Sequence, residues 1–448
     1  MSIRVIGAGL AGCEAAWQAA EAGIPVDLYE MKPVRFSPAH HREDFCELVC
    51  SNSLKAERLE SAAGLLKEEM RRLGSLLTAC AAQCRVPAGG ALAVDRDAFA
   101  SLVTRQIRSH SLIRVHTEEI TELPTDGITV IATGPLTADT LAAKISERFG
   151  GCLSFFDAAA PIVTAESLNR DRIFAASRYG RGEDDAYLNC PMNKEEYEHF
   201  ASELVQAQRA PLHDFDTADP KVYEGCMPVE IMVQRGENTL RFGPMKPVGL
   251  RDPQTGHRPW AVLQLRQENA EGSLYNLVGF QTNLTFGEQK RGFGLIPGLE
   301  NADYMRFGVM HRNTFLNSPE LLNADFSVRT CPDLFFAGQI TGVEGYMESA
   351  FSGIVAGINA VRRHAGLPAA ILPVDTMTGA LSSYVAHGGI GPFQPMGANF
   401  GILPPLGTAI RDKRERYAAF SERALQSLDL FIKNFTVGKR DAENENHC

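Results

Sequence analysis

The chain has 448 residues, 44% of them apolar, and its 44 Lys and Arg against 54 Asp and Glu give a formal charge of -10 at pH 7. This length accommodates two or three domains with a sizeable core, and the acidic balance argues against a general nucleic-acid coat while it still permits a local basic patch. No run of about 20 uncharged apolar residues occurs, and Arg4 leads directly into the first apolar run, so we expect no membrane span, no signal peptide and a cytoplasmic location.

The first predicted element is a strand over residues 3–6, followed by a glycine-rich turn and an Ala-rich stretch of helical composition. In this context Gly7 permits a tight turn, Gly9 lets a pyrophosphate approach the backbone, and Gly12 allows close contact between helix and strand. The amides at the helix N-terminus then face the phosphates. The residues predicted to bind the cofactor here are Gly7, Ala8, Gly9, Leu10, Ala11 and Gly12.

A second apolar run, 26–29, predicts the next strand, and Glu30 follows it directly. A carboxylate at this position typically accepts hydrogen bonds from a ribose hydroxyl, which favours an adenosine without a 2'-phosphate. A helical pattern follows over 53–77, with Asn52 or Ser53 as its N-cap, and another over 95–107. Residues 126–135 then predict a buried strand that ends in a small-residue turn.

The middle of the chain, from about residue 179 to 299, changes character. Alternating runs such as "TLRFGPMKPV" (239–248) and "WAVLQLRQE" (260–268), with many Pro and Gly, predict a β-rich inserted domain. The segment 331–363 returns to an apolar strand, a glycine-rich turn and a long helix, which matches the second phosphate or flavin contact of a doubly wound fold.

These elements predict an α/β fold, in which a Rossmann-like FAD-binding domain with a doubly wound parallel sheet carries an inserted β-rich α+β domain. The predicted divisions are 1–180 for the first part of the FAD-binding domain, 181–300 for the inserted domain, and 301–448 for the second part with C-terminal helices. FAD is preferred to NAD, because an NAD-binding dehydrogenase would leave the distal glycine turn without a role. In that turn the residues predicted to line the flavin are Gly338, Gln339, Gly345 and Tyr346, with Glu348 or Ser349 near the ring edge.

Six longer motifs, spread over nearly the whole chain, carry a resemblance to a known family. They are "GAGLAGCEAA" (7–16), "LYEMKP" (28–33), "ELVCSNSLK" (47–55), "YEGCMPVE" (223–230), "GVMHRNTFLNSP" (308–319) and "FAGQITGVEGYMESAFSG" (336–353). In this order they resemble the bacterial folate- and flavin-dependent tRNA uracil-5-methyltransferases. A longer flavoprotein family that modifies the tRNA wobble uridine shares the style of the distal turn, but the shorter chain and the "CSNS" segment favour the methyltransferases.

The resemblance implies an enzyme that forms 5-methyluridine at position 54 in the T-loop of tRNA. Its carbon donor would be 5,10-methylenetetrahydrofolate, its cofactor FAD, and its reductant NADPH or NADH. Close relatives methylate a uridine of ribosomal RNA with the same parts, so both RNAs stay open as substrates. The expected partners are tRNA and folate, with no membrane and no protein partner.

Two cysteines are candidates for the chemistry. C5 of uracil is a poor nucleophile, and addition of a thiolate at C6 generates an enolate whose C5 can attack an activated methylene group. Cys50 precedes the helix predicted to begin near Ser53, whose dipole would lower the thiol pKa, although a small buried core thiol is the alternative. Cys226 falls in a predicted loop, and the resemblance makes it the second functional cysteine. The roles of uracil nucleophile and of thiol or base near the flavin stay open between them.

The spacing of the remaining cysteines favours a role in packing. Ten cysteines without framework spacing favour reduced thiols over disulfides. Cys46 with Cys50, and Cys80 with Cys84, are spaced to share one helix face, but structural zinc sites prefer closer spacing. We therefore predict no metal site and assign Cys46, Cys80 and Cys84 to packing.

Folate has to place its methylene carbon near the flavin, so one face of its pterin should stack on the flavin and the other on a flat side chain. By the resemblance, His311 in "MHRNTF" is that side chain, whereas a lone His is more often a satisfied structural group. Arg312 and Asn313 are predicted to fix the pterin or the glutamate tail.

A uridine inside an RNA loop reaches a buried flavin only if it leaves its stack, which implies a flipped base and a cationic rim. The predicted phosphate contacts are Arg411, Lys413, Arg414 and Arg416, followed by Arg71 and Arg72. The alternative for each basic cluster is a solvated helix face with Glu neighbours.

Two other function classes share the flavin-binding features. A small-molecule flavin oxidoreductase would use the same fold and cofactor and would need no RNA. A flavin-bearing interaction protein would keep FAD as a structural group that NADPH does not reduce.

Overall fold

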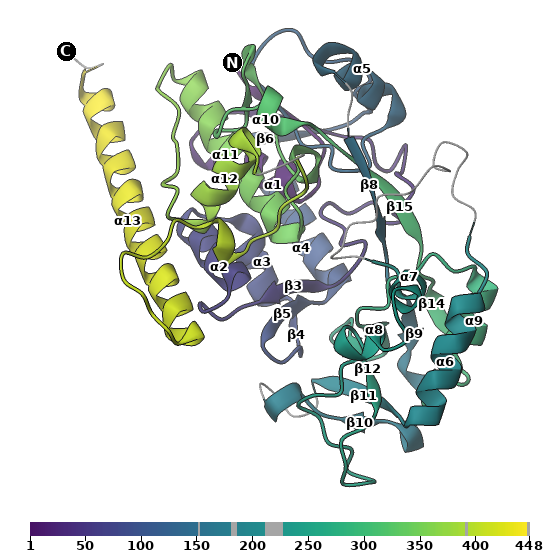
Figure 1. Cartoon of the computed structure of the whole chain (residues 1–448). Helices are drawn as coiled ribbons and strands as arrows, with labels where there is room; N and C mark the ends of the chain where they lie inside the picture. The colour runs from purple at the N-terminus through teal and green to yellow at the C-terminus, as the bar shows by residue number, and fades with distance from the viewer. Residues whose placement is uncertain (151–152, 181–185, 211–226, 390–392, 446–448) are drawn as a thin grey trace.

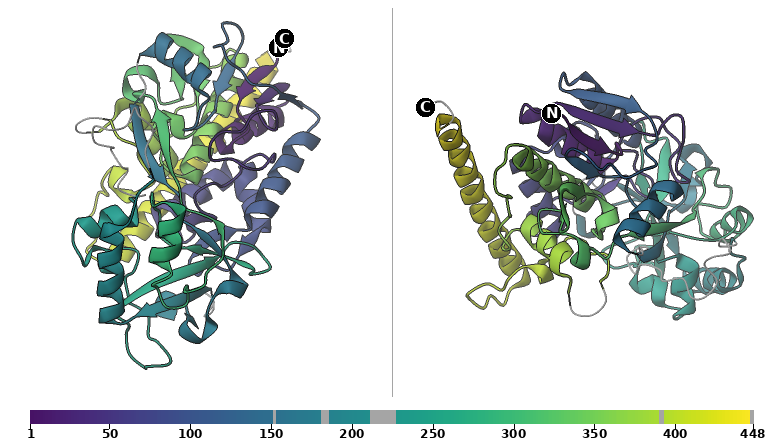
Figure 2. Two further views of the ribbon diagram at one scale, coloured as in Figure 1. Left: turned by 90° about the vertical axis from the view of Figure 1, so that its right-hand side faces the viewer. Right: turned by 90° about the horizontal axis from the view of Figure 1, so that it is seen from above.

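The computed structural model describes residues 1–150, 153–180, 186–210, 227–389 and 393–445 and consists of two lobes (Figure 1). Both ends of the chain belong to the larger lobe, and the middle of the chain, drawn in teal, forms the smaller one. The long C-terminal helix lies along one side of the larger lobe, with its far end standing clear of it (Figure 2).

The bounds of the elements are as follows. The strands are β1 Ile3–Ile6, β2 Val26–Glu30, β3 Ser53–Ala56, β4 Arg85–Val86, β5 Ala91–Val94, β6 Ile113–Thr117, β7 Thr129–Ile131, β8 Leu153–Ala158, β9 Ile162–Thr164, β10 Phe174–Ala175, β11 Tyr187–Met192, β12 Ala261–Gln267, β13 Leu274–Leu277, β14 Tyr304–Arg306, β15 Met310–Phe315, β16 Ser327–Val328 and β17 Cys331–Phe336. The helices are α1 Leu10–Glu21, α2 Ala62–Arg72, α3 Leu76–Gln83, α4 Arg96–Ser109, α5 Asp139–Phe149, α6 Lys194–Gln206, α7 Val229–Gln234, α8 Thr239–Phe242, α9 Phe286–Phe293, α10 Ser318–Leu321, α11 Tyr346–His364, α12 Met377–His387 and α13 Lys413–Glu445.

The larger lobe is built on a six-stranded sheet in the order β16-β17-β7-β1-β2-β6. β1 pairs in parallel with β2 on one side and with β7 on the other, β6 and β17 extend the parallel part, and β16 is antiparallel at one edge. The strand order therefore reverses at β1. In open α/β sheets ligands bind outside the carboxyl ends of the strands at such a switch point. The predicted fold class is confirmed.

Two helices of the larger lobe touch almost backbone to backbone. A Cβ atom placed on Gly353 of α11 would lie 2.1 Å from the carbonyl oxygen of Ala11 in α1, and one on Gly357 would lie 2.9 Å from the Cα of Ala15. Side chains at these positions would push the helices apart. The helix that follows the first glycine turn is thus locked to the helix that follows the distal one.

The smaller lobe holds a second six-stranded sheet, in the order β10-β11-β12-β13-β9-β14, whose pairs are antiparallel. The antiparallel ribbon of β8 and β15 runs between the two lobes (Figure 1). Because β9 lies before residue 181 and β14 after residue 300, the strands of this sheet extend beyond the expected segment 181–300 on both sides. These two strands are only three residues long, and their pairing partners are more than 100 residues away.

Two local predictions are wrong. The segment 53–77 is not one helix that begins at Ser53: residues 53–56 form β3, which pairs with β5, and α2 begins at Ala62 with Ser61 as its N-cap. Asn52 caps no helix: its Oδ1, the atom that would accept from a helix amide, accepts from Nε of Arg266, and its Nδ2 donates to the carbonyl of Val94. In the run 239–248, expected to be extended, residues 239–242 form α8.

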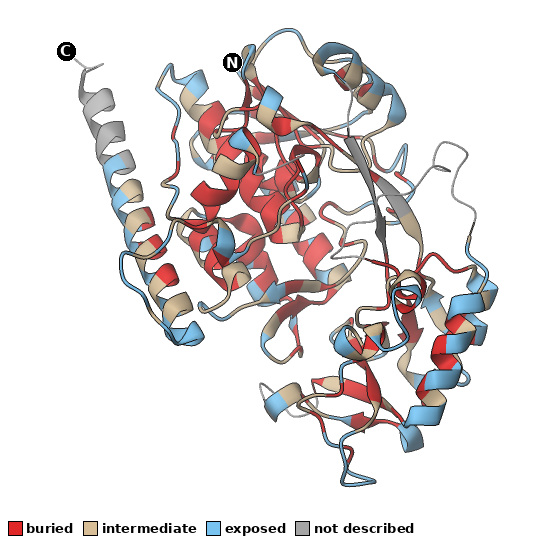
Figure 3. Ribbon diagram, viewed as in Figure 1, coloured by how far each residue is buried: buried red, intermediate tan, exposed pale blue. Residues whose placement is uncertain are grey.

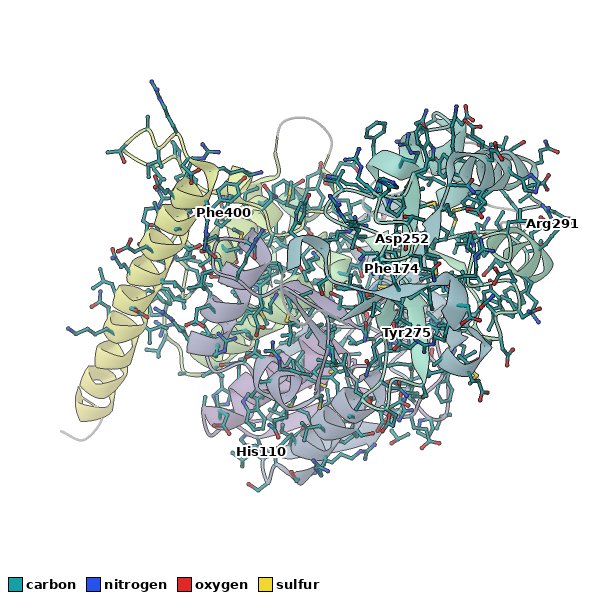
Figure 4. The ribbon with its side chains drawn as sticks, turned by 90° about the horizontal axis from the view of Figure 1, so that it is seen from below. His110, Phe174, Asp252, Tyr275, Arg291 and Phe400 are labelled. Carbon is teal, nitrogen blue, oxygen red and sulfur yellow. The ribbon has the colours of Figure 1, made fainter. Side chains whose placement is uncertain are left out.

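Each lobe has its own apolar core (Figure 3). At the margin of the larger core, Phe400 lies beside α13 (Figure 4), with its ring centroid 4.4 Å from that of Tyr417 and 5.7 Å from that of Phe420. No helix in the described part of the chain combines the length and the apolar character needed to cross a bilayer.

Two fully buried carboxylates cap helices of the larger lobe. Glu14 accepts hydrogen bonds from the amides of Leu76 and Leu77 at the start of α3, and Glu69 accepts from the amides of Met377 and Thr378 at the start of α12. Burial raises the pKa of each carboxyl group from 4.5 to about 7, although the hydrogen bonds oppose this shift. Each carboxylate ties two segments together at the expense of its own solvation.

Candidate active site

The first glycine turn lies between β1 and α1. Gly7 has a φ of +97°, and a Cβ atom there would meet the carbonyl oxygen of Ala132 at 2.7 Å. A Cβ atom on Gly12 would lie 1.8 Å from the carbonyl oxygen of Gly7, whereas one on Gly9 would have no atom within 4 Å. The outer glycines are therefore required by the fold, and Gly9 leaves the backbone open for a phosphate to approach.

Glu30 closes this turn from the end of β2. Its carboxylate accepts a hydrogen bond from the amide of Ala8 at 2.8 Å and another from the amide of Lys32 at 3.0 Å. The side chain is buried, and each of its oxygens has a further lone pair for a ribose hydroxyl. The residue predicted to bind ribose thus also fixes the shape of the phosphate-binding turn.

A pocket opens at the carboxyl ends of β1, β2, β7 and β17 and brings both glycine turns together. Of the residues predicted to bind the cofactor, those that line it are Gly7, Ala8, Gly9, Leu10, Ala11, Glu30, Gly338, Gln339, Tyr346 and Ser349. Gly12, Gly345 and Glu348 are outside its lining. The small-residue turn after β7, with Thr133 and Gly134, forms another wall of the pocket.

Of the three predicted residues that do not line the pocket, Gly12 is held by the first turn as described above, and Gly345 and Glu348 stabilise the distal turn. Gly345 has a φ of +125°, and a Cβ atom there would lie 2.2 Å from Oε2 of Glu348. Oε1 of Glu348 accepts hydrogen bonds from Nζ of Lys55 at 2.7 Å and from the amide of Ala398 at 3.0 Å. Its Oε2 has no hydrogen-bond partner among the described residues. The ion pair ties the distal turn to β3.

Cys50 lies at the edge of this pocket and outside its lining: it follows the lining residue Val49 in the chain and contacts the lining residue Tyr346. Since no helix begins near Ser53, the predicted effect of a helix dipole on this thiol is wrong. The phenolic oxygen of Tyr346, 296 residues away in sequence, lies 2.9 Å from the sulfur of Cys50 and 2.8 Å from its amide nitrogen. The distal turn therefore contributes directly to the environment of the thiol.

The loop that carries Cys50 is held by arginines that the sequence analysis did not single out. Arg96 of α4 donates to the carbonyl of Leu48 at 2.7 Å and pairs with Glu268 at 2.6 Å, and both side chains of this pair are largely buried. Arg266 of β12 donates to Oδ1 of Asn52 and to Oγ of Ser51, both at 2.8 Å. Residues of the smaller lobe thus fix a loop of the larger lobe. In the sequence, Arg266 and Glu268 are merely charges within the alternating run 260–268, and Arg96 is a charge within the predicted helix 95–107.

The structure describes the predicted folate-binding residues and does not describe the second predicted catalytic cysteine. Cys226 lies outside the described residues. His311 and Arg312 belong to β15, opposite Asp157 and Phe156 of β8 in the backbone pairing, and Asn313 is buried. The amide of Thr314 donates to the carbonyl of Pro135, which lines the pocket, so β15 passes beside it.

The cysteines assigned to packing are buried in the larger core. Cys46 lies in a loop with a φ of +53°, so the helical spacing assumed for Cys46 and Cys50 does not apply. Burial raises the pKa of the Cys80 thiol to about 12.

The predicted RNA contacts lie at two places: Arg411, Lys413, Arg414 and Arg416 at or just before the start of α13, and Arg71 and Arg72 at the end of α2. Arg411, Lys413 and Arg414 are exposed, and Arg414 reaches Glu60 at 3.4 Å, while Arg416 donates to the carbonyl of Ile410. Arg71 and Arg72 both pair with Glu68, and Arg72 also pairs with Asp429 of α13.

The parallel sheet with its switch point at β1, and a pocket that joins two glycine turns, define a dinucleotide-binding protein of the flavoprotein type. A family model described as "Glucose inhibited division protein A" matches residues 2–368. A relative from Acetivibrio thermocellus, named "Methylenetetrahydrofolate--tRNA-(uracil-5-)-methyltransferase TrmFO", is 58% identical over 97% of this chain and 99% of its own. A relative of the same name from Desulfitobacterium hafniense is 59% identical over 96% of this chain and 98% of its own.

The chain therefore belongs to the glucose inhibited division protein A family, and within it to the group that carries the TrmFO name. The resemblance stated from the motifs is confirmed. A crystal structure of Aquifex aeolicus GidA has the same fold, with a TM-score of 0.69 at 16% identity, and the alignment covers 96% of this chain but 76% of that one.

Proposed function

We propose that this protein is a methylenetetrahydrofolate–tRNA-(uracil-5-)-methyltransferase, which transfers a one-carbon unit from 5,10-methylenetetrahydrofolate to C5 of a uridine in tRNA. The observation that carries this proposal is the identity of 58–59%, over nearly the full length of both chains, to relatives named for that reaction. The position of Cys50 at the edge of the dinucleotide pocket is consistent with it.

FAD is the cofactor that suits this pocket. The amides of the first glycine turn and of the α1 N-terminus would hold the pyrophosphate, Glu30 the adenosine ribose, and the distal turn around Gly338 the flavin. When bound, FAD supplies the redox chemistry and the relay of the one-carbon unit, with NADPH or NADH as the source of electrons.

Cys50 and Cys226 would share the work on the uracil base. A thiolate forms a bond to C6, the electron pair of the C5–C6 bond moves into an enolate that extends to O4, and C5 becomes nucleophilic toward the one-carbon donor. C5 bonds to the methylene carbon, the C5 proton is removed, and the bond from the methylene carbon to its donor nitrogen breaks. A hydride equivalent drawn from NADPH or NADH then completes the methyl group, as expulsion of the sulfur restores the C5–C6 double bond. His311, Arg312 and Asn313 are proposed to hold the folate.

The RNA target is proposed to be the uridine at position 54 of the T-loop, flipped out of its stack. The exposed cations at the start of α13, Arg411, Lys413 and Arg414, together with Arg416, are proposed to contact phosphates. Because tRNA is made and used in the cytoplasm, we propose that compartment for the enzyme. We also propose that residues 159–309, rather than 181–300, form the inserted domain, since β9 and β14 belong to its sheet.

The test is incubation of the purified protein with labelled 5,10-methylenetetrahydrofolate, NADPH and either tRNA or ribosomal RNA, followed by nucleoside analysis. Labelled 5-methyluridine in tRNA alone is the expected result. The variants Cys50→Ser and Cys226→Ser should keep bound FAD and lose the label, whereas Cys331→Ser, a half-buried thiol on β17 outside the pocket lining, should keep both.

Label in ribosomal RNA instead would transfer the proposal to that substrate. Oxidation of NADPH without folate or tRNA, and without methyl incorporation, would support a small-molecule flavin oxidoreductase. A bound flavin that NADPH cannot reduce would point to an interaction protein.

A further inference from the structure

The hydroxyl of Tyr346 sits among three groups of the Cys50 loop. Its oxygen lies 2.8 Å from the amide nitrogen of Cys50, 3.2 Å from the amide nitrogen of Ser51 and 2.9 Å from the sulfur of Cys50. The ring of the same residue lines the dinucleotide pocket. One side chain thus touches both the pocket and the thiol beside it.

The donors around the Tyr346 hydroxyl determine which atom donates in its hydrogen bond with the sulfur of Cys50. A phenol donates one hydrogen bond and accepts two. The amides of Cys50 and Ser51 can only donate, so they occupy both acceptor positions of the Tyr346 oxygen. Its own proton then points to the sulfur. If the thiol donated instead, the oxygen would face three donors and its proton would have no acceptor.

Charged groups from three elements also face the sulfur. The guanidinium groups of Arg96 on α4, Arg266 on β12 and Arg306 on β14 each interact electrostatically with Cys50. Among the described residues, the carboxylates in this environment are Glu268, which is paired with Arg96, and Glu47, which faces Arg306. In this described part of the chain, the three guanidinium groups outnumber the two carboxylates, which favours an anion at the sulfur.

The hydroxyl of Tyr346 itself stays protonated in this setting. Burial raises the pKa of the phenol well above its usual value, and the neighbouring Cys50 adds to this effect. A thiolate is a stronger acceptor than a thiol, and hydrogen bonds to charged acceptors are shorter and stronger than neutral ones. The arrangement thus selects one protonation state for each partner: a neutral phenol and an ionised thiol.

We propose that Tyr346 is a positioning residue that donates a hydrogen bond to the sulfur of Cys50 and holds it as a thiolate at the edge of the pocket. This replaces the helix dipole as the source of activation. The use of the thiolate on uracil rests on the proposed function, whereas its formation does not.

The test is the pH dependence of Cys50 alkylation by iodoacetamide in the FAD-bound protein, followed by mass spectrometry of the peptide that contains Cys50. In the wild-type protein the midpoint should lie below the ordinary thiol pKa of about 8.5. In Tyr346→Phe, which keeps the ring and removes the hydroxyl, it should rise by about one to two units, with about tenfold or more loss of alkylation at pH 7. Tyr384→Phe, whose hydroxyl donates to the carbonyl of Gln394, should leave the midpoint unchanged.

A merely structural role for Tyr346 would alter the limiting alkylation rate at high pH and not the midpoint. Equal midpoints in the wild type and Tyr346→Phe would overturn the proposal. Should Tyr346→Phe fail to fold, an ordinary midpoint in the wild type would overturn it by itself. A shifted midpoint in a protein that methylates no RNA would refute the proposed function and leave the role of Tyr346 standing.

Discussion

The ion pair between Arg96 and Glu268 joins the two lobes, and its loss should be measurable. Nε of Arg96 lies 2.6 Å from Oε2 of Glu268, and the exposed fractions of the two side chains are 13% and 3%. Removing one partner of a buried pair costs about 3–5 kcal/mol, because the remaining charge stays buried. Since Arg96 keeps its bond to the carbonyl of Leu48, we expect Glu268→Gln to lower the free energy of unfolding by about 3 kcal/mol, the low end of this range.

The two tryptophans make the assay specific for each lobe, because Trp17 lies on α1 and Trp260 directly precedes β12. Urea unfolding followed by fluorescence, in the full chain and in versions with one tryptophan, should show the loss from both probes. As a matched control, Glu288→Gln removes an exposed pair with Arg291 and should cost less than about 0.5 kcal/mol. A loss below about 1 kcal/mol in Glu268→Gln would refute the reasoning.

Three further predictions address the turn, the buried carboxylates and the RNA surface. Gly12→Ala should destabilise the protein even without FAD, because its Cβ would lie 1.8 Å from a backbone oxygen. Gly9→Ala should instead weaken FAD binding and leave the stability of the flavin-free protein unchanged. Equal flavin affinities for Gly9→Ala and the wild type would contradict this. Folding raises the pKa of Glu69 to about 7, so the stability that its carboxyl group contributes is complete below pH 4.5 and is lost as the pH rises through about 7. Relative to Glu69→Gln, the free energy of unfolding of the wild type should fall by about 3 kcal/mol between pH 4 and 8. The same pH dependence in both proteins would exclude this contribution. Reversing both charges, Arg411→Glu with Arg414→Glu, should reduce the salt dependence of tRNA binding by about two units of log–log slope, and an unaltered slope would remove these residues from the interface.

The local sequence pattern predicted those elements whose structure depends on residues that are close together in the chain. The strand–turn–helix unit from Ile3 to Glu21 follows from glycine spacing and apolar runs, and the strand and helix after Cys331 follow in the same way. The pattern failed to predict an element whose structure depends on pairing with a strand that is distant in the chain. Residues 53–56 extend because β5 lies about 40 residues further on, although their composition suits a helix.

The site shows the same division. The residues that line the pocket near the glycine turns were accessible from sequence, because their roles depend on local backbone shape. Arg96, Arg266 and Glu268 resemble ordinary surface charges in the sequence, yet Arg266 and Glu268 are buried and Arg96 is half-buried where the lobes meet. Likewise, nothing in the sequence brings Tyr346 to Cys50 across 296 residues.

The bonds from Arg266 to Ser51 and Asn52 mean that the loop that carries Cys50 is completed by a lobe with an apolar core of its own. A fragment limited to the nucleotide-binding half would still display the sulfur, but its loop would lack the anchor that sets its direction. Deletion of the smaller lobe should therefore leave the glycine turns that face the pocket in place, while the sulfur of Cys50 loses its fixed orientation.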